Sequence, residues 1–413
     1  MNLSNLSNSN VSYVNFNDSE INDTVMQKNN LDDASFFGVD AYKLKIQFSS
    51  LKNANIYGAE LKESDFTGSN LSDACLNSSI IINSNFDEAN LSNTQISYVN
   101  DDNSSFVQSI LNGSKIKHIY VSEASLQDAD LSNIDFSFSE LHQVNVSNAD
   151  IRHGKFHNTK VANSNMNGSF FDHSLFTSAK IEDSDLSTTS MYKTKIQDSQ
   201  VYNSTLSRHN IDSSEIENST FFNLLADNSS WSNLKVTNSN FIESDFRSSL
   251  LHANAFRKIS FFLSNLSNST ISDMSFHSSS IYKSSVADAH LTDCKFDNSI
   301  LIDNQGQKKL AGLENAITSI GDLQEKISQG EKFDNMNLEN ADFSNSTLSR
   351  AKFVNVNLNK ANLEKTDLRY TVFDNSSLIG TNLSNSNLEG SSFLNSDPKS
   401  TMLKNAKKND RKK

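Results

Sequence analysis

Two histidines, His153 and His173, are the first residues whose type and spacing suggest chemistry, because they lie twenty residues apart in a chain of short repeats. Imidazole nitrogens are common zinc ligands, so such a pair could share a metal ion. No cysteine or carboxylate completes the pair, and we therefore interpret both as solvated surface residues. A third histidine, His209, replaces a small inward residue, which predicts a core histidine that is hydrogen-bonded within its own coil.

Asp101 stands where the surrounding pattern has a large apolar residue. A buried carboxyl group close to Asp102 would have a raised pKa and could serve as a general acid or base. Asn100, Asp102 and Asn103 surround it with polar side chains, and this favours a local bulge that turns Asp101 toward water. Acid–base catalysis also needs a second placed group and a concave site, which nothing in this segment supplies.

Motifs for nucleotide, zinc or redox chemistry are missing from the sequence. It has no glycine-rich phosphate loop, no Cys-X-X-Cys and no His-Glu-X-X-His. The two cysteines, Cys75 and Cys294, lie far apart and do not form a disulfide framework, so a reducing compartment is expected. We predict that the protein is not an enzyme and that it binds no cofactor.

The elements that hold these side chains follow from a period of five residues. Stepping by five from Leu6 to Leu301 gives sixty positions, of which 57 are Leu, Ile, Val, Met, Phe or Trp. Two residues before each centre the side chain is small in most cases. Helices and strands repeat at 3.6 and 2.0 residues, so neither explains this period. A coil whose straight sides are one pentapeptide long does explain it.

Phenylalanine spacing gives the number of sides in each coil. If four pentapeptides make one turn, residues twenty apart stack directly, and bulky rings should gather in columns. Such columns occur repeatedly: Phe66, Phe86 and Phe106; Phe136, Phe156 and Phe176; Phe221, Phe241 and Phe261; and Phe256, Phe276 and Phe296. The sequence thus predicts a four-sided solenoid in which each coil contacts only its neighbours.

Segments such as 341–345, Ala-Asp-Phe-Ser-Asn, and 361–365, Ala-Asn-Leu-Glu-Lys, closely resemble the pentapeptide-repeat family. The resemblance covers about nine tenths of the chain. It implies an all-β solenoid, a right-handed quadrilateral parallel β-helix, here with one short α-helical interruption. For function it implies less, since the family includes gyrase-protecting DNA mimics, effectors secreted by pathogens and many proteins whose role is unknown.

Breaks in the register divide the chain into four parts. Residues 1–302 form the first array, of about fifteen coils, and residues 331–398 form the second, in which thirteen centres are all Leu or Phe. The linker, 303–330, has apolar residues spaced along one helical face, which predicts an amphipathic helix over 308–328. Residues 399–413 form a basic tail without a core pattern, and we expect it to be disordered.

One side of the first array carries apolar residues just after its centres, at positions that should point outward. We expect these six residues to form an exposed stripe, and contiguous exposed apolar surface usually marks a contact site: Tyr202, Phe222, Ile242, Phe262, Tyr282 and Ile302. The stripe is our candidate partner-binding site. Two alternatives remain: the 308–328 helix folds back over it, or it is the seam of a homodimer.

Charge narrows the class of partner. The chain carries 36 basic and 49 acidic residues, and without the tail 29 and 48 remain, a balance of −19. An acidic rod repels nucleic acid, so direct binding to it is not expected. No apolar run is long enough to span a membrane, although the basic tail allows weak contact with a membrane surface.

The sequence therefore predicts a non-catalytic protein–protein interaction scaffold, in its specific form a bacterial secreted effector that acts on a host protein. The alternative is an acidic DNA mimic that binds a type II topoisomerase (gyrase) and protects or inhibits it. Since Met1 is followed by polar sequence and no cleavable signal peptide is visible, we expect the bacterial cytoplasm, or secretion into a host cell by a route without such a peptide.

Overall fold

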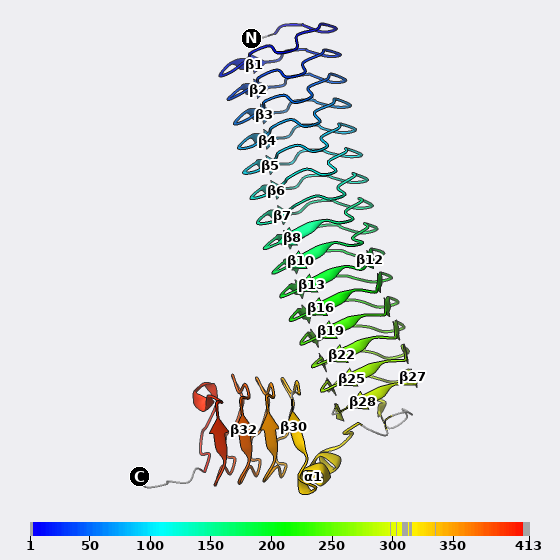
Figure 1. Cartoon of the computed structure of the whole chain (residues 1–413), viewed down its shortest axis with the longest axis vertical. Coiled ribbons are helices and arrows are strands. Elements are labelled where there is room, and N and C mark those ends of the chain that lie inside the picture. Colours follow the sequence, from blue (N-terminus) through cyan, green and yellow to red (C-terminus); the bar gives the residue numbers. More distant parts are fainter. Residues whose placement is uncertain are drawn as a thin grey trace. The chain divides into compact units, whose positions relative to one another are not determined.

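The computed structural model describes residues 3–297, 299–302, 304–307, 313, 316–334 and 336–407. The chain divides into two compact units, Met1–Glu215 and Ile216–Lys413. In each unit, short parallel strands lie one above another as the rungs of a solenoid (Figure 1), with about 18 turns in the two units together. The predicted solenoid is therefore confirmed.

The strands are three residues long, and each one pairs with the strand twenty residues further on. In the first pair, Glu20 lies opposite Asp40 and Ile21 lies opposite Ala41. Single parallel bridges with the same offset of twenty continue the ladders where no strand is assigned. Four pentapeptides thus make one turn, as the phenylalanine columns predict.

Residues 1–215 contain three ladders of strands. The longest runs through β1 (Glu20–Asn22), β2 (Asp40–Tyr42), β3 (Glu60–Lys62), β4 (Ile80–Ile82), β5 (Asn100–Asp102), β6 (Tyr120–Ser122), β7 (Glu140–His142), β9 (Lys160–Ala162), β11 (Lys180–Glu182) and β14 (Gln200–Tyr202). The others comprise β8 (Lys155–His157), β10 (Leu175–Thr177) and β13 (Lys195–Gln197), and β12 (Ser190–Tyr192) with β15 (Asn210–Asp212). At the boundary of the unit lies β16 (Glu215–Glu217).

Residues 216–413 contain the later coils of the first array and the whole second array. The first array is continued by β17 (Thr220–Phe222), β20 (Asn240–Ile242), β23 (Ser260–Phe262), β26 (Ser280–Tyr282) and β29 (Ile300–Ile302), by β18 (Ser230–Ser232), β21 (Leu250–His252), β24 (Thr270–Ser272) and β27 (His290–Thr292), and by β19 (Lys235–Thr237), β22 (Ala255–Arg257), β25 (Ser275–His277) and β28 (Lys295–Asp297). The second array contains β30 (Lys332–Asp334), β31 (Lys352–Val354), β32 (Val372–Asp374) and β33 (Ser392–Leu394).

Tight corners between the sides explain the high content of Asn and Asp. Two residues after each centre the backbone turns through the left-handed region, as at Asn8, Asp33 and Asn53, with φ between 56° and 59°. Asn and Asp tolerate this conformation better than other residues with a side chain, because they hydrogen-bond to the local backbone. The polar corner residues therefore make the chain turn and leave the centres pointing inward.

The core consists of stacked columns of large side chains beside columns of small ones. Phe66 and Phe86 stack with ring centroids 4.7 Å apart and an interplanar angle of 6°. At the small position, a buried serine donates to a backbone carbonyl of the previous coil, as Ser69 Oγ does to Ile46 O at 2.8 Å. Because such bonds satisfy the hydroxyls, serine is tolerated inside the solenoid.

The helix is shorter than predicted. The helix α1 covers Ile320–Ser328, and residues 308–312, 314 and 315 of the predicted helix lie outside the described residues. Ile317 belongs instead to a parallel bridge with Ile300. Ser319 has an extended backbone and caps the helix by accepting a hydrogen bond from Asp322 N. The apolar residues that predict one long helix thus belong to two structures: Ile317 occupies a position in the solenoid, and the later ones lie on a nine-residue helix.

The prediction of a disordered tail from residue 399 is wrong for its first part. The 3₁₀ turn η2 (Pro398–Ser400) leads into another partial coil, in which Met402 bridges to Asn382 and Lys407 to Asn387. Pairing with the preceding coil compensates for the loss of a strict core pattern. Residues 408–413 of the predicted tail lie outside the described residues.

Candidate functional site

The predicted stripe lies on the side of the first array that carries β14, β17, β20, β23, β26 and β29. Tyr202, Phe222, Ile242 and Phe262 are half-buried. At the end of the stripe, Tyr282 and Ile302 are only 4% and 7% exposed. These two side chains cannot face a partner, so the expectation of an outward-facing stripe is corrected at this end.

Helix α1 and the second array account for that burial. Leu323 and Ile327 of α1 belong to one hydrophobic cluster with Tyr282 and Ile302, and Phe262 packs against the same cluster. The first coils of the second array contribute a larger set to it, including Phe333, Met336, Leu338, Ala341 and Phe343. The intramolecular alternative raised by the sequence thus holds for this end of the stripe, with the second array as an additional cover.

Polar contacts hold the second array against the same coils. The Tyr282 hydroxyl donates to the carbonyl of Asp342 at 3.4 Å, and Lys283 Nζ lies 3.6 Å from the Asp342 carboxylate. Asn240 Nδ2 donates to Glu339 Oε2 at 3.1 Å. Burial raises the pKa of Asp342, but hydrogen bonds from Ser344 and the nearby Lys283 outweigh it and hold the pKa below its ordinary value. Asp342 is therefore a charged partner at neutral pH.

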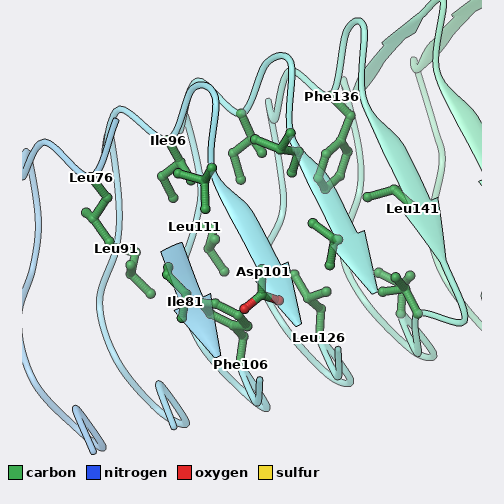
Figure 2. Close-up of a pocket in the computed structure, with 16 residues that line it drawn as sticks. Leu76, Ile81, Leu91, Ile96, Asp101, Phe106, Leu111, Leu126, Phe136 and Leu141 are labelled. Carbon is green, nitrogen blue, oxygen red and sulfur yellow. The ribbon is translucent and has the colours of Figure 1, made fainter. Parts of the chain in front are cut away.

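Asp101 lies inside the solenoid, on β5. Its residue is 3% exposed, and its backbone is paired in register with Ile81 on one side and Val121 on the other. A cavity of about 40 Å³ adjoins it and is otherwise lined by apolar side chains. Figure 2 shows the two carboxylate oxygens among the carbons of Ile81, Phe106 and Leu126. The predicted bulge is wrong, because the ladders on both sides keep β5 straight.

The environment of Asp101 favours the neutral acid. Burial is the main reason that the pKa of Asp101 is raised to about 7; the Ser104 hydroxyl opposes the shift, and the negative charge of Asp102 adds to it. Neither carboxylate oxygen has a hydrogen-bond partner of good geometry within the described residues. No second titratable side chain lines the cavity, so the geometry provides no acid–base pair.

His209 is a core histidine, as predicted. It is 1% exposed, and its Nδ1 lies 2.7 Å from the carbonyl oxygen of Leu206. Burial lowers the pKa of His209 to about 4, although the bond to Leu206 opposes the shift. The imidazole is therefore neutral at physiological pH, and it acts as a large replacement for the usual serine.

Asp101 and His209 should give opposite pH dependences of stability. Folded Asp101 keeps its proton up to about pH 7, whereas an unfolded aspartate loses it near 3.8, so its effect weakens the fold as pH rises through that window. Folded His209 stays neutral down to about pH 4, whereas an unfolded histidine is protonated below 6.5, so its effect weakens the fold as pH falls.

We expect each single variant to show the pH dependence of stability that the remaining group, His209 or Asp101, produces. Relative to wild type, in which the two effects largely cancel, Asp101→Asn should lose about 3 kcal/mol of unfolding free energy on going from pH 6.5 to 4. His209→Ser should lose about 3 kcal/mol on going from pH 4 to 7. Urea denaturation at a series of pH values measures both slopes. Parallel curves for the two variants would contradict the assignment.

His153 and His173 stack on each other at the surface. Their ring centroids are 4.9 Å apart with an interplanar angle of 11°, and His173 also meets the ring of Tyr192 edge-on. The described residues contain no group of three His, Cys, Asp or Glu side chains that could hold a metal ion. The two exposed rings therefore stack on successive coils at the surface of the solenoid.

A ladder of lysines on another side was missed by the sequence reasoning. Bridges and strand pairs align Lys115, Asp135, Lys155, Leu175 and Lys195 one coil apart, the last three on β8, β10 and β13. We call these five residues the lysine ladder. The spacing of twenty or forty residues between these side chains predicts the ladder, whereas the net charge of the whole chain conceals it.

The single acid of the lysine ladder is already paired. Lys117 Nζ lies 2.9 Å from Asp135 Oδ2, and Ser137 N donates to Oδ1 at 3.1 Å. Burial raises the pKa of Asp135, but the bonds from Ser137 and Lys117 outweigh it and keep the pKa below its ordinary value. Within the described part of the chain, Lys115, Lys155 and Lys195 form no ion pair. The ladder therefore presents uncompensated positive charge.

No helix among the described residues has the length and apolarity needed to cross a membrane.

Family models match both arrays. The model described as "Pentapeptide repeat region" matches residues 331–403, and the one described as "Pentapeptide repeats (8 copies)" matches residues 47–81, 122–158 and 155–192. A comparison with curated proteins finds no match.

Solved structures that match part of this chain include QnrB1, described as a plasmid-mediated fluoroquinolone resistance protein, at 13% identity. The match covers 46% of this chain and 90% of QnrB1, with a TM-score of 0.32. HetL, a protein of the cyanobacterium Nostoc described as involved in heterocyst differentiation regulation, matches at 16% identity over 55% of this chain and 87% of its own, with a TM-score of 0.20.

Proposed function

Since this chain belongs to the pentapeptide-repeat family, we propose that it is a non-catalytic scaffold that binds another protein along the sides of its first array. One observation carries the proposal. Outward side chains of the array form straight ladders with one step per coil, as the pairing of Leu175 with Lys155 and Lys195 illustrates. A rigid ladder presents its groups without an ordering cost, and preorganisation of this kind favours binding.

The placement of the unusual titratable groups also supports a binding role. Asp101 and His209 lie in the core, where a substrate in solvent would not meet them. Their shifted pKa values are explained by burial in the solenoid. Shifted pKa values mark functional sites only when the groups line an accessible cleft.

More specifically, we propose that the scaffold is a bacterial effector that reaches a host protein without a cleaved signal peptide. A DNA mimic that binds a type II topoisomerase is favoured less. The chain has a net charge of −13, but the lysine ladder interrupts its acidic surface with uncompensated positive charge. A mimic of the phosphate backbone needs negative charge along the surface that its target contacts.

Site-specific photo-crosslinking tests the scaffold proposal. A photoreactive amino acid is placed in turn at Leu175 and at three outward positions on the other sides, Gln127, Ile110 and Tyr120. The full chain is then expressed both in its own cells and in host cells. We expect one or two positions to crosslink the same protein reproducibly. Absence of a crosslink at every position would contradict the scaffold proposal. Stoichiometric inhibition or quinolone protection of gyrase in a supercoiling assay would instead favour the DNA mimic over the effector.

A further inference from the structure

We infer that the lysine ladder docks an acidic α-helix of the partner protein, lying along the solenoid axis with one acidic residue in every seven facing the ladder. This inference rests on the proposed scaffold function and deepens it by naming the surface and the chemistry of the partner.

Charge on neighbouring sides selects this surface. In the same coils, the ladder on the side before it has no lysine and carries two acids, Asp130 and Asp150. Arg152 forms an ion pair with Asp150, which leaves the charge of Asp130 on that ladder. Among the five residues of the lysine ladder, Asp135 is the one acid, and Lys117 already neutralises it. The next acid on this side is Glu215 of β16, one coil beyond Lys195. An anionic group that approaches the array is therefore attracted more strongly to the lysine ladder than to the ladder that contains Asp130.

Spacing selects a helix as the occupant. Adjacent coils lie roughly 4.8 Å apart, so Lys115, Lys155 and Lys195 stand at intervals of about 10 Å. Seven residues of an α-helix rise about 10.5 Å, which aligns acids at positions 1, 8 and 15 with the three lysines. In an extended strand, side chains on one face recur every ~6.6 to 6.8 Å and would miss the middle lysine.

Leu175 adds an apolar contact between two of the charges. It is 36% exposed and lies one coil from both Lys155 and Lys195. A helix residue midway between two acids, three or four positions from each, would rest on it. The acidic residues of the docked helix orient it and raise its association rate. Its apolar residue removes the Leu175 side chain from water.

A protein helix fits this surface better than a nucleic acid does. The whole chain has a net charge of −13, so a long polyanion is repelled by the rest of the rod. A short segment with a few acids on one face experiences mainly the local lysines, because charges beyond about 10 Å are screened at 0.1 M salt.

The test uses the full chain and labelled helical peptides of 18 residues. Glutamates stand at positions 1, 8 and 15, and leucine stands at position 4 or 11, so that both directions along the ladder are represented. Matched peptides carry glutamine in place of the three glutamates. Fluorescence anisotropy at about 0.1 M salt should show binding of one glutamate peptide, at least tenfold weaker binding of its glutamine match, and loss of affinity as more salt is added.

Charge reversal locates the binding. K115E/K155E/K195E should weaken the glutamate peptide at least tenfold, whereas K28E/K45E/K52E, with the same change in net charge on other positions, should not. K155Q should lose a smaller part of the affinity, and circular dichroism verifies that each variant keeps the wild-type fold.

Several results would overturn the inference: equal binding by the two triple variants, no binding of either glutamate peptide, or tighter binding of a DNA duplex than of the peptides. If photo-crosslinks to a partner map only to positions outside the lysine ladder, this inference fails while the scaffold function stands. If no position crosslinks, the scaffold function itself fails.

Discussion

Replacing Asp101 with isoleucine is expected to stabilise residues 1–215 by about 4 kcal/mol at pH 7.5. The reason is that folding moves the pKa of Asp101 from 3.8 to about 7, and three pKa units correspond to roughly that free energy. Isoleucine is already present at the paired position 81, and the cavity of about 40 Å³ leaves room for the longer side chain. Urea denaturation monitored by circular dichroism measures the gain.

Two companion variants separate charge from packing. Asp101→Asn removes the charge but leaves polar atoms in an apolar cavity, so it should recover only part of the gain. As a control, the single variant Asp102→Ile introduces isoleucine at the exposed neighbouring position. It should change stability by less than about 0.5 kcal/mol. If Asp101→Ile destabilised the protein at pH 7.5, Asp101 would have to form an interaction that the described structure does not contain.

The repeat made most of the fold predictable. Phe66 and Phe86 are twenty residues apart in sequence, and they stack because that interval is one turn. The same interval places His153 on His173, whereas the period of five makes His209 a core residue. Such contacts follow from the sequence because each coil meets only the coils beside it.

Asp101 shows where local reasoning fails. Its polar neighbours favour a bulge, but a bulge would break the backbone hydrogen bonds of β5 to both β4 and β6. Each unsatisfied buried backbone group costs on the order of 1 to 3 kcal/mol, and a bulge would strand several. Keeping one neutral carboxyl group inside the core is the smaller penalty, and only the neighbouring ladders reveal this.

The linker and the stripe depend on contacts that no local pattern encodes. Ile317 fits a helical face in sequence, yet pairing with Ile300 extends the solenoid instead. The outward positions of Tyr282 and Ile302 predict exposure, but α1 and the second array bury both side chains. Packing between segments distant in sequence is not visible in a period of five.

Removing the α1 cover should expose the end of the stripe. Leu323 is fully buried in the cluster with Tyr282 and Ile302, and Leu→Ala changes at such sites cost about 2 to 5 kcal/mol. We expect Leu323→Ala to destabilise the covered region by about 3 kcal/mol. Relative to wild type, amide hydrogen exchange in Leu323→Ala should become faster in α1 and β30 but not in the β17 to β20 coils. Only α1 and β30 depend on Leu323.

The matched control is Ile379→Ala in the second array, where the side chain is 61% exposed and the expected change is below about 0.5 kcal/mol. Binding of an apolar dye should rise in Leu323→Ala and not in the control, since uncovered Tyr282 and Ile302 form an exposed apolar surface. Unchanged exchange in α1 and β30 would mean that Leu323 does not hold the cover. The polar contacts from Asp342 to Tyr282 and Lys283 would then be the ones that keep the second array in place.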